Sequence, residues 1–117
     1  MEKITAEKAR ELIKKIFEND ELFFNKEFDH HFDELKADMQ HDFIDWCKEV
    51  EQGNIPHTPI THKRYRDWIL FIDKKADKRV LIVKVKNQAF IEVHLSGHKY
   101  YDDQRKRFGI KRGSRYY

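Results

Sequence analysis

Apolar residues in the first half of the chain recur at helical spacing and define two segments. The first is a short helix expected over about residues 6–19, with Thr5 as its N-cap. Its apolar face consists of Ala9, Leu12, Ile13 and Ile16.

The second helical segment has the clearest periodicity of the chain. Its apolar residues follow one another at steps of three or four, which places them on one helical face: Phe28, Phe32, Leu35, Met39, Phe43, Trp46 and Val50. Neither Gly nor Pro occurs between residues 25 and 52, so the segment is either one long helix or two helices that break near residues 36–38. In the second case Asp38 can act as a cap, and in both cases Gly53 is a suitable end.

The second half of the chain predicts β-strands after a loop, "GNIPHTPITHKR", in which Pro56 and Pro59 exclude a helix. The segments "RDWILFID", "RVLIVKVK" and "AFIEVHLS" are joined by short connections, which indicates an antiparallel meander. A turn at Asn87–Gln88 sets the register of the last two segments. One face then carries Val80, Ile82, Lys84, Ile91, Val93 and Leu95, and the other carries Leu81, Val83, Val85, Phe90, Glu92 and His94.

These elements predict one α+β domain whose helices pack on one face of the meander and leave the other face partly open. A chain of 117 residues is long enough for one such domain. It divides into an additional N-terminal helix at residues 1–20, a core at 22–103 and a basic, aromatic tail at 104–117. Gly109 and Gly113 favour a loose tail. We expect the domain to fold without the residues after Asp103, because the helical stripe and the meander are then still complete.

Charge is distributed unevenly between the two halves of the chain. Residues 1–52 contain 8 basic and 15 acidic residues, a net of −7, whereas residues 53–117 contain 16 basic and 6 acidic residues, a net of +10. A half this basic is typical of proteins that bind a polyanion such as RNA. The alternative is that the two halves neutralise each other on one surface.

No segment predicts a membrane or secretory location. The chain has no apolar run near 18 residues, and no apolar signal-peptide core follows Met1. The single cysteine, Cys47, cannot form an internal disulfide, so we expect a reduced, cytoplasmic setting without a membrane partner. The seven histidines lack metal-ligand spacing, and phosphate-binding or nucleophile motifs are missing, so we expect no metal and no cofactor.

Three stretches resemble the RelE/ParE family of toxin components. "LFFNKEFDHHFDELKADMQHDFIDWCKEV" resembles a short apolar start followed by helices, "RYRDWILFID" a strand that begins with a Tyr-Arg pair, and "KRVLIVKVKNQAFIEVHLSGHKYYDD" two strands with a His-x-Tyr ending. The resemblance spans about Leu22–Asp103 and implies a small sheet with helices on one face. Many members cleave mRNA without a metal, often on the ribosome, and are held inactive by an antitoxin segment wrapped around them. Members of the ParE branch act on gyrase instead.

The resemblance implies a catalytic set of Arg66, Arg79 and His98 with a terminal tyrosine, either Tyr100 or Tyr101, of which Tyr101 is preferred. Metal-free RNA cleavage needs a base for the 2′-hydroxyl, a cation for the phosphorane charge and an acid for the leaving oxygen. Arginines can clamp a phosphate, and histidine titrates in the required range. The structural alternatives are salt bridges to nearby carboxylates, a loop histidine and tyrosines that pack the end of the sheet.

A further set of residues is expected to hold RNA phosphates or to stack on bases. It consists of Lys84, Lys99, Tyr100, Arg105, Lys106, Arg107, Lys111, Arg112 and Arg115. The alternative is a solvated tail that packs Phe108 on the domain and does nothing else.

The expected function is that of a toxin component, a metal-independent endoribonuclease that cleaves mRNA. Its expected partners are RNA, including mRNA on the ribosome, and a cognate antitoxin protein. The alternative is a non-enzymatic binding protein, such as a ParE-like gyrase inhibitor or an RNA-binding adaptor.

Overall fold

The computed structural model describes residues 1–58, 60, 62–85 and 87–110. In chain order the elements are α1 (Ala6–Ile16), β1 (Glu21–Phe24), α2 (Phe28–Glu34), α3 (Ala37–Glu51), the 3-10 helix η1 (Lys63–Tyr65), β2 (Trp68–Lys75), β3 (Lys78–Val85), β4 (Phe90–Ser96) and α4 (His98–Phe108). The class is α+β, as predicted. Of the helices described, none is both long enough and apolar enough to cross a membrane.

Local sequence sets the helix boundaries in the first half of the chain. The Thr5 hydroxyl accepts the N–H of Lys8 at 3.1 Å and so caps α1, as predicted. The long apolar stripe is divided between α2 and α3 because Leu35 and Lys36 have extended backbone angles, which confirms the two-helix alternative. The N-cap of α3 is Lys36 rather than Asp38, whose carboxylate accepts the N–H of the next residue at 2.9 Å.

The four strands form one mixed sheet in the order β1-β4-β3-β2. Strands β2, β3 and β4 are the predicted antiparallel meander, and the register of β3 and β4 is the predicted one, with Val80 opposite Leu95 and Ile82 opposite Val93. The sequence pattern does not predict β1, which joins the edge of the sheet parallel to β4. Parallel pairing requires a long connection, and the whole segment from α2 to β3 provides it here.

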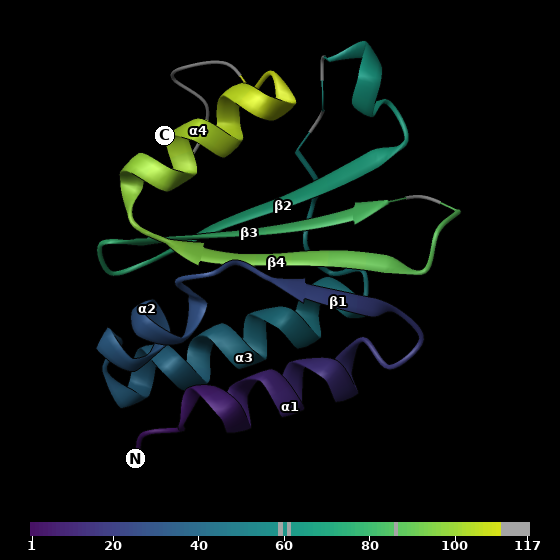
Figure 1. Ribbon diagram of the computed structural model, residues 1–117. Coiled ribbons are helices and arrows are strands. Elements are labelled where there is room, and N and C mark those ends of the chain that lie inside the picture. The colour runs from purple at the N-terminus through teal and green to yellow at the C-terminus, as the bar shows by residue number, and fades with distance from the viewer. Residues whose placement is uncertain (59, 61, 86, 111–117) are drawn as a thin grey trace.

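The sheet lies between two helical layers (Figure 1). Helices α1, α2 and α3 cover one face, and α4 crosses the other. The larger core fills the space between the sheet and α1–α3, where Phe32, Phe43, Ile82 and Val93 are fully buried. Cys47 belongs to this core, and burial raises the pKa of its thiol.

Helix α4 corrects the expectation of a loose tail. Residues 98–108 are helical, and Tyr101, Arg105 and Phe108 recur at helical spacing on its buried face. Gly109 ends the helix with a φ of +70°, and its N–H and that of the next residue bond back to carbonyls of the last turn. This Schellman arrangement favours glycine, because other residues rarely adopt a positive φ.

A second, smaller core lies between α4 and the β2–β3 half of the sheet. It consists of Leu70, Ile72, Leu81, Val83, Tyr101, Phe108 and Ile110. Residues 104–110 are therefore packed on the sheet as part of the folded domain, which argues against the expectation that folding needs nothing after Asp103. The rest of the predicted tail, residues 111–117, lies outside the described residues.

Asn25 fixes the end of β1 on the sheet. Its amide nitrogen donates to the carbonyl of Leu95 at 3.0 Å, and its amide oxygen accepts the N–H of Leu95 at 2.9 Å. Asn25 is buried, so both hydrogen bonds are shielded from water. The position of β1 beside β4 is thereby held by a side chain as well as by the strand ladder.

Candidate functional site

The face of the sheet that carries α4 has two halves of different character. Over β2 and β3, α4 covers the apolar second core. On β4, Glu92 and His94 alternate with residues of the larger core and so lie on the α4 side of the sheet. This polar half, over β4 and the edge strand β1, is the candidate functional site.

Glu92 is paired with Arg107 of α4. Nη1 of Arg107 donates to Oε1 at 3.0 Å, and Nη2 donates to Oε2 at 3.2 Å. The carboxylate belongs to a residue only 7% exposed, so it requires such partners. Burial acts to raise the pKa of Glu92, but hydrogen bonds from His94 and Arg107 outweigh it and hold the pKa below its ordinary value. Glu92 is therefore ionised at neutral pH.

Arg107 is itself held in place by aromatic rings. Its guanidinium carbon lies 5.7 Å from the ring centre of Tyr65, 5.5 Å from that of Trp68 and 4.5 Å from that of Phe108. Nη1 also donates to the side-chain oxygen of Gln104 at 3.1 Å. These contacts favour the charged guanidinium and fix its direction toward Glu92.

His94 connects Glu92 to Tyr100. Its Nε2 lies 2.8 Å from Glu92 Oε1, and its Nδ1 lies 2.8 Å from Tyr100 Oη. Because an ionised carboxylate only accepts hydrogen bonds, Nε2 carries a proton, and in that tautomer Nδ1 accepts from the Tyr100 hydroxyl. Burial and the negative charge of Glu92 raise the pKa of Tyr100, so this hydroxyl keeps its proton at neutral pH.

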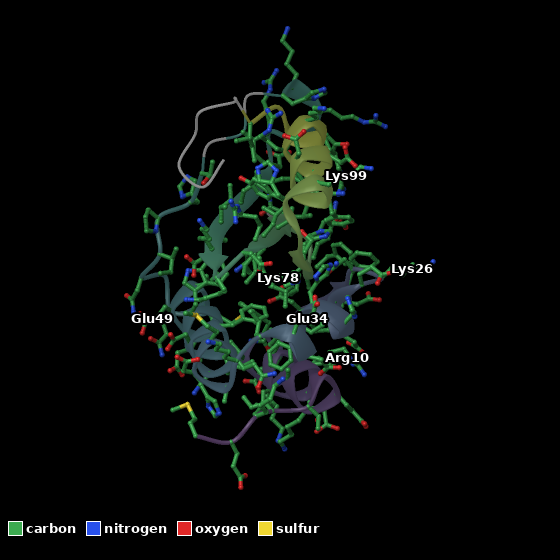
Figure 2. The ribbon with its side chains drawn as sticks, turned by 90° about the vertical axis from the view of Figure 1, so that its left-hand side faces the viewer. Arg10, Lys26, Glu34, Glu49, Lys78 and Lys99 are labelled. Carbon is green, nitrogen blue, oxygen red and sulfur yellow. The ribbon has the colours of Figure 1, made fainter. Side chains whose placement is uncertain are left out.

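The result is a continuous chain of hydrogen bonds from a buried carboxylate to a half-buried tyrosine. Glu92 and His94 are buried, whereas Tyr100 is half-buried. Lys99 precedes Tyr100 on α4, is exposed and projects from the helix (Figure 2). A proton can move along this chain of hydrogen bonds, and Lys99 is the exposed residue next to Tyr100 in the sequence.

The predicted catalytic residues do not form one cluster. Arg66 is exposed and lies at the end of η1, just before β2 begins. Arg79 and His98 lie at the starts of β3 and α4, at the opposite end of the sheet. The two ends of an eight-residue strand are roughly 25 Å apart. Arg66 therefore cannot act on the same phosphate as Arg79 or His98.

Tyr101 is a core residue rather than a surface residue. It is 1% exposed, and among the described residues its hydroxyl has no hydrogen-bond partner. Burial raises the pKa of Tyr101, while the nearby charges of Arg79 and Arg105 act in the opposite direction. Of the two candidate terminal tyrosines, Tyr100 is thus the one with a route to the surface.

Two of the residues predicted to bind RNA occupy other positions. Arg105 is 8% exposed, pairs with Asp102 at 2.9 Å and donates to the carbonyl of Ile110 at 2.8 Å. It therefore holds the end of α4 and is not available to a phosphate. Lys84 is exposed, but it shares a strand face with Val80 and so lies on the side of the sheet opposite α4.

The remaining predicted RNA-binding residues divide into three groups. Tyr100 and Arg107 belong to the hydrogen-bond chain described above. Lys99 and Lys106 are exposed on α4, and Nζ of Lys106 lies 3.4 Å from Oδ2 of Asp102. Three more are outside the part of the chain that the structure describes: Lys111, Arg112 and Arg115.

Glu92 and His94 are the residues of this site that the sequence did not identify as functional. The signal was present, because strand alternation places both on the same polar face. Their significance depends on Tyr100 and Arg107, which reach them only because residues 98–108 form a helix across the sheet.

The chain matches no family model, no curated protein and no solved structure. Within the ranges that the structure describes, no three His, Cys, Asp or Glu side chains are grouped as metal ligands would be. The hydrogen-bonded series Glu92–His94–Tyr100 is therefore the feature of the described structure that points most directly to a function.

Proposed function

We propose that this protein binds RNA and cleaves it as a metal-independent endoribonuclease, in the manner of a RelE-like toxin controlled by an antitoxin. The observation that supports the proposal is the Glu92–His94–Tyr100 chain of hydrogen bonds, in which an ionised carboxylate lies behind an imidazole and the hydroxyl of a half-buried tyrosine lies in front of it. Such a chain can take up a proton at the hydroxyl without creating an isolated buried charge, because Glu92 stabilises the imidazolium that forms.

The proposed reaction begins at the 2′-hydroxyl of the nucleotide before the scissile bond. Tyr100 passes its proton to Nδ1 of His94 while its oxygen takes the proton of the 2′-hydroxyl. The 2′ oxygen then bonds to phosphorus, and the bond from phosphorus to the 5′ oxygen breaks. The leaving oxygen takes a proton from solvent or from His98, which is exposed in the first turn of α4. The products are a 2′,3′-cyclic phosphate and a 5′-hydroxyl end, and His94 then returns the proton that it took up to solvent through Tyr100.

Positive charge near the site supports an RNA substrate over a neutral one. Lys99 precedes Tyr100 in the sequence and is exposed, and its ammonium group can offset negative charge on the phosphorane oxygens. The half of the chain from residue 53 onward has a net charge of +10. Binding through phosphates releases counterions, so affinity for RNA is expected to fall steeply as salt increases.

The test is induced expression of the protein alone, followed by mapping of mRNA ends. The expected result is growth arrest with new 5′-hydroxyl ends. Tyr100→Phe removes the hydroxyl that exchanges the proton and should reduce cleavage by at least about 100-fold. Tyr101→Phe is the matched control, because it removes a hydroxyl from the adjacent residue that does not reach the site. Normal growth and intact transcripts at verified protein levels would contradict the proposal.

A non-enzymatic RNA-binding protein is the second candidate function. The observation that favours it is that Glu92 and His94 are 7% and 2% exposed and satisfy each other, as a purely structural network would. In that case RNA is bound but not cut, and Tyr100→Phe leaves the affinity for RNA unchanged.

A further inference from the structure

Phe23 on the edge strand β1 is an exposed aromatic side chain beside the candidate site. In the part of the chain that the structure describes, Phe23 at 47% and Met1 at 85% are the large hydrophobic residues that are exposed. Its neighbours Leu22 and Phe24 are partly buried against the larger core, so alternation along the strand turns Phe23 to the other face of the sheet. A single exposed apolar residue is common, so its surroundings decide what it can do.

Those surroundings are the rings of the hydrogen-bond chain. Phe23 lies opposite Glu92 in the sheet, and its ring centre is 5.9 Å from that of His94, at an angle of 58°. The His94 ring is in turn 5.7 Å from that of Tyr100, at 36°. Three rings from β1, β4 and α4 therefore lie in a row that leads from the open edge of the sheet to the Tyr100 hydroxyl.

Two exposed lysines lie close in the sequence to the residues that carry these rings. Lys26 follows β1 by two residues, Lys99 precedes Tyr100, and both are exposed. Figure 2 shows Lys99 and Lys26 on the same flank of the molecule, with Lys99 beside α4. The nearby carboxylate of Glu92 is paired with Arg107, so it does not cancel these charges.

We propose that Phe23 is a stacking subsite for an unpaired base of single-stranded RNA, with Lys26 and Lys99 contacting the phosphates on either side. The inference rests on the proposed function and specifies the substrate class: a base can cover the face of Phe23 only if it is not stacked within a duplex. The base of the nucleotide before the scissile bond would cover the Phe23 ring, and the 2′-hydroxyl of that nucleotide's ribose would face Tyr100.

The experiment measures binding without cleavage. A fluorescent 2′-O-methyl oligoadenylate of about 12 nucleotides is titrated with the full-length protein and its variants, and the dissociation constant is read from anisotropy. Phe23→Ala and Phe23→Leu should both weaken binding by about tenfold, whereas Phe23→Tyr should retain it, because stacking requires a ring. A duplex of the same length should bind less tightly than the single strand and show no effect of Phe23→Ala.

The outcomes separate this inference from the proposed function. If the wild-type protein binds the oligonucleotide and Phe23→Ala binds it equally well, the stacking subsite is wrong while the proposed function is untouched. If Phe23→Leu binds as well as wild type but Phe23→Ala does not, Phe23 is a generic apolar contact, suited to a protein partner, and the inference is overturned. If the wild-type protein neither binds nor cuts RNA, the proposed function itself fails.

Discussion

The guanidinium of Arg107 on α4 and the carboxylate of Glu92 on β4 meet in a two-pronged ion pair, with N–O distances of 3.0 and 3.2 Å. The pair ties the C-terminal helix to the central sheet. It also supplies the positive charge that keeps Glu92 ionised in a buried position, on which the whole chain to Tyr100 depends.

Arg107→Ala should destabilise the protein by about 2–4 kcal/mol, measured by urea unfolding, because it leaves Glu92 buried with a partner missing. Lys106→Ala is the matched control on the same helix. The Lys106 side chain is 66% exposed, so its removal should change the free energy of unfolding by less than about 0.5 kcal/mol. Equal effects of the two substitutions would show that the ion pair contributes no stability.

Glu92 should also make stability depend on pH. Its pKa in the folded protein is below the ordinary value of 4.5, so its contribution is present above that pH and is lost as pH falls through the lower, folded value. The unfolding free energy of wild type should therefore fall more steeply below about pH 4.5 than that of Glu92→Gln. Some acid sensitivity should remain in the variant, because hydrogen bonds to Lys78 and Arg105 lower the pKa of Glu34 and Asp102 as well. Parallel stability curves for the two proteins would contradict the role assigned to Glu92.

Two truncations separate the folded part of the C-terminal segment from the residues beyond it. A chain ending at Asp103 lacks Phe108 and Ile110, which are 0% and 4% exposed in the second core. Deleting one such phenylalanine side chain typically costs about 3–5 kcal/mol, a large share of the stability of a domain this size, so cooperative unfolding should be lost. A chain ending at Ile110 should keep its cooperative transition by circular dichroism.

The chain that ends at Ile110 also tests the role of the final basic residues. It lacks Lys111, Arg112 and Arg115. If all three contact phosphates, the slope of log affinity against log salt concentration for single-stranded RNA should become shallower by about 2. An unchanged slope would mean that these cations do not contact RNA.

The helical layer and the meander could be predicted because each depends on local periodicity. The stripe from Phe28 to Val50 and the alternation in β3 and β4 both appear as buried faces. Strand β1 could not be predicted in this way, since four residues carry little periodic signal and its partner strand lies about 70 residues further along the chain. Helix α4 was missed because Arg105 occupies the middle of its apolar stripe. That charge is satisfied within the helix by Asp102, so it can be buried.

The candidate site was only partly predictable for the same reason. Tyr100 and Arg107 were selected for their chemistry, and Glu92 and His94 were placed on the correct face, but the contact between the two pairs depends on α4. Arg66 and Arg79 both adjoin strands, yet antiparallel pairing puts the start of β2 beside the end of β3 and so separates them. Residue type identified possible chemistry, while tertiary packing decided which groups meet.

The two adjacent tyrosines should respond in opposite ways to loss of their hydroxyls. In the described part of the chain the Tyr101 hydroxyl is buried without a partner, so Tyr101→Phe should leave the free energy of unfolding unchanged or raise it by up to about 1 kcal/mol. Tyr100→Phe removes the hydroxyl that donates to His94 Nδ1 and should lower the free energy of unfolding by about 1 kcal/mol. Urea unfolding and RNA cleavage should be measured for both variants. Tyr101→Phe should be at least as stable as wild type and fully active, whereas Tyr100→Phe should be slightly less stable and inactive. A clear loss of stability in Tyr101→Phe would mean that its hydroxyl is hydrogen-bonded in solution, and loss of cleavage in that variant would return Tyr101 to the catalytic set.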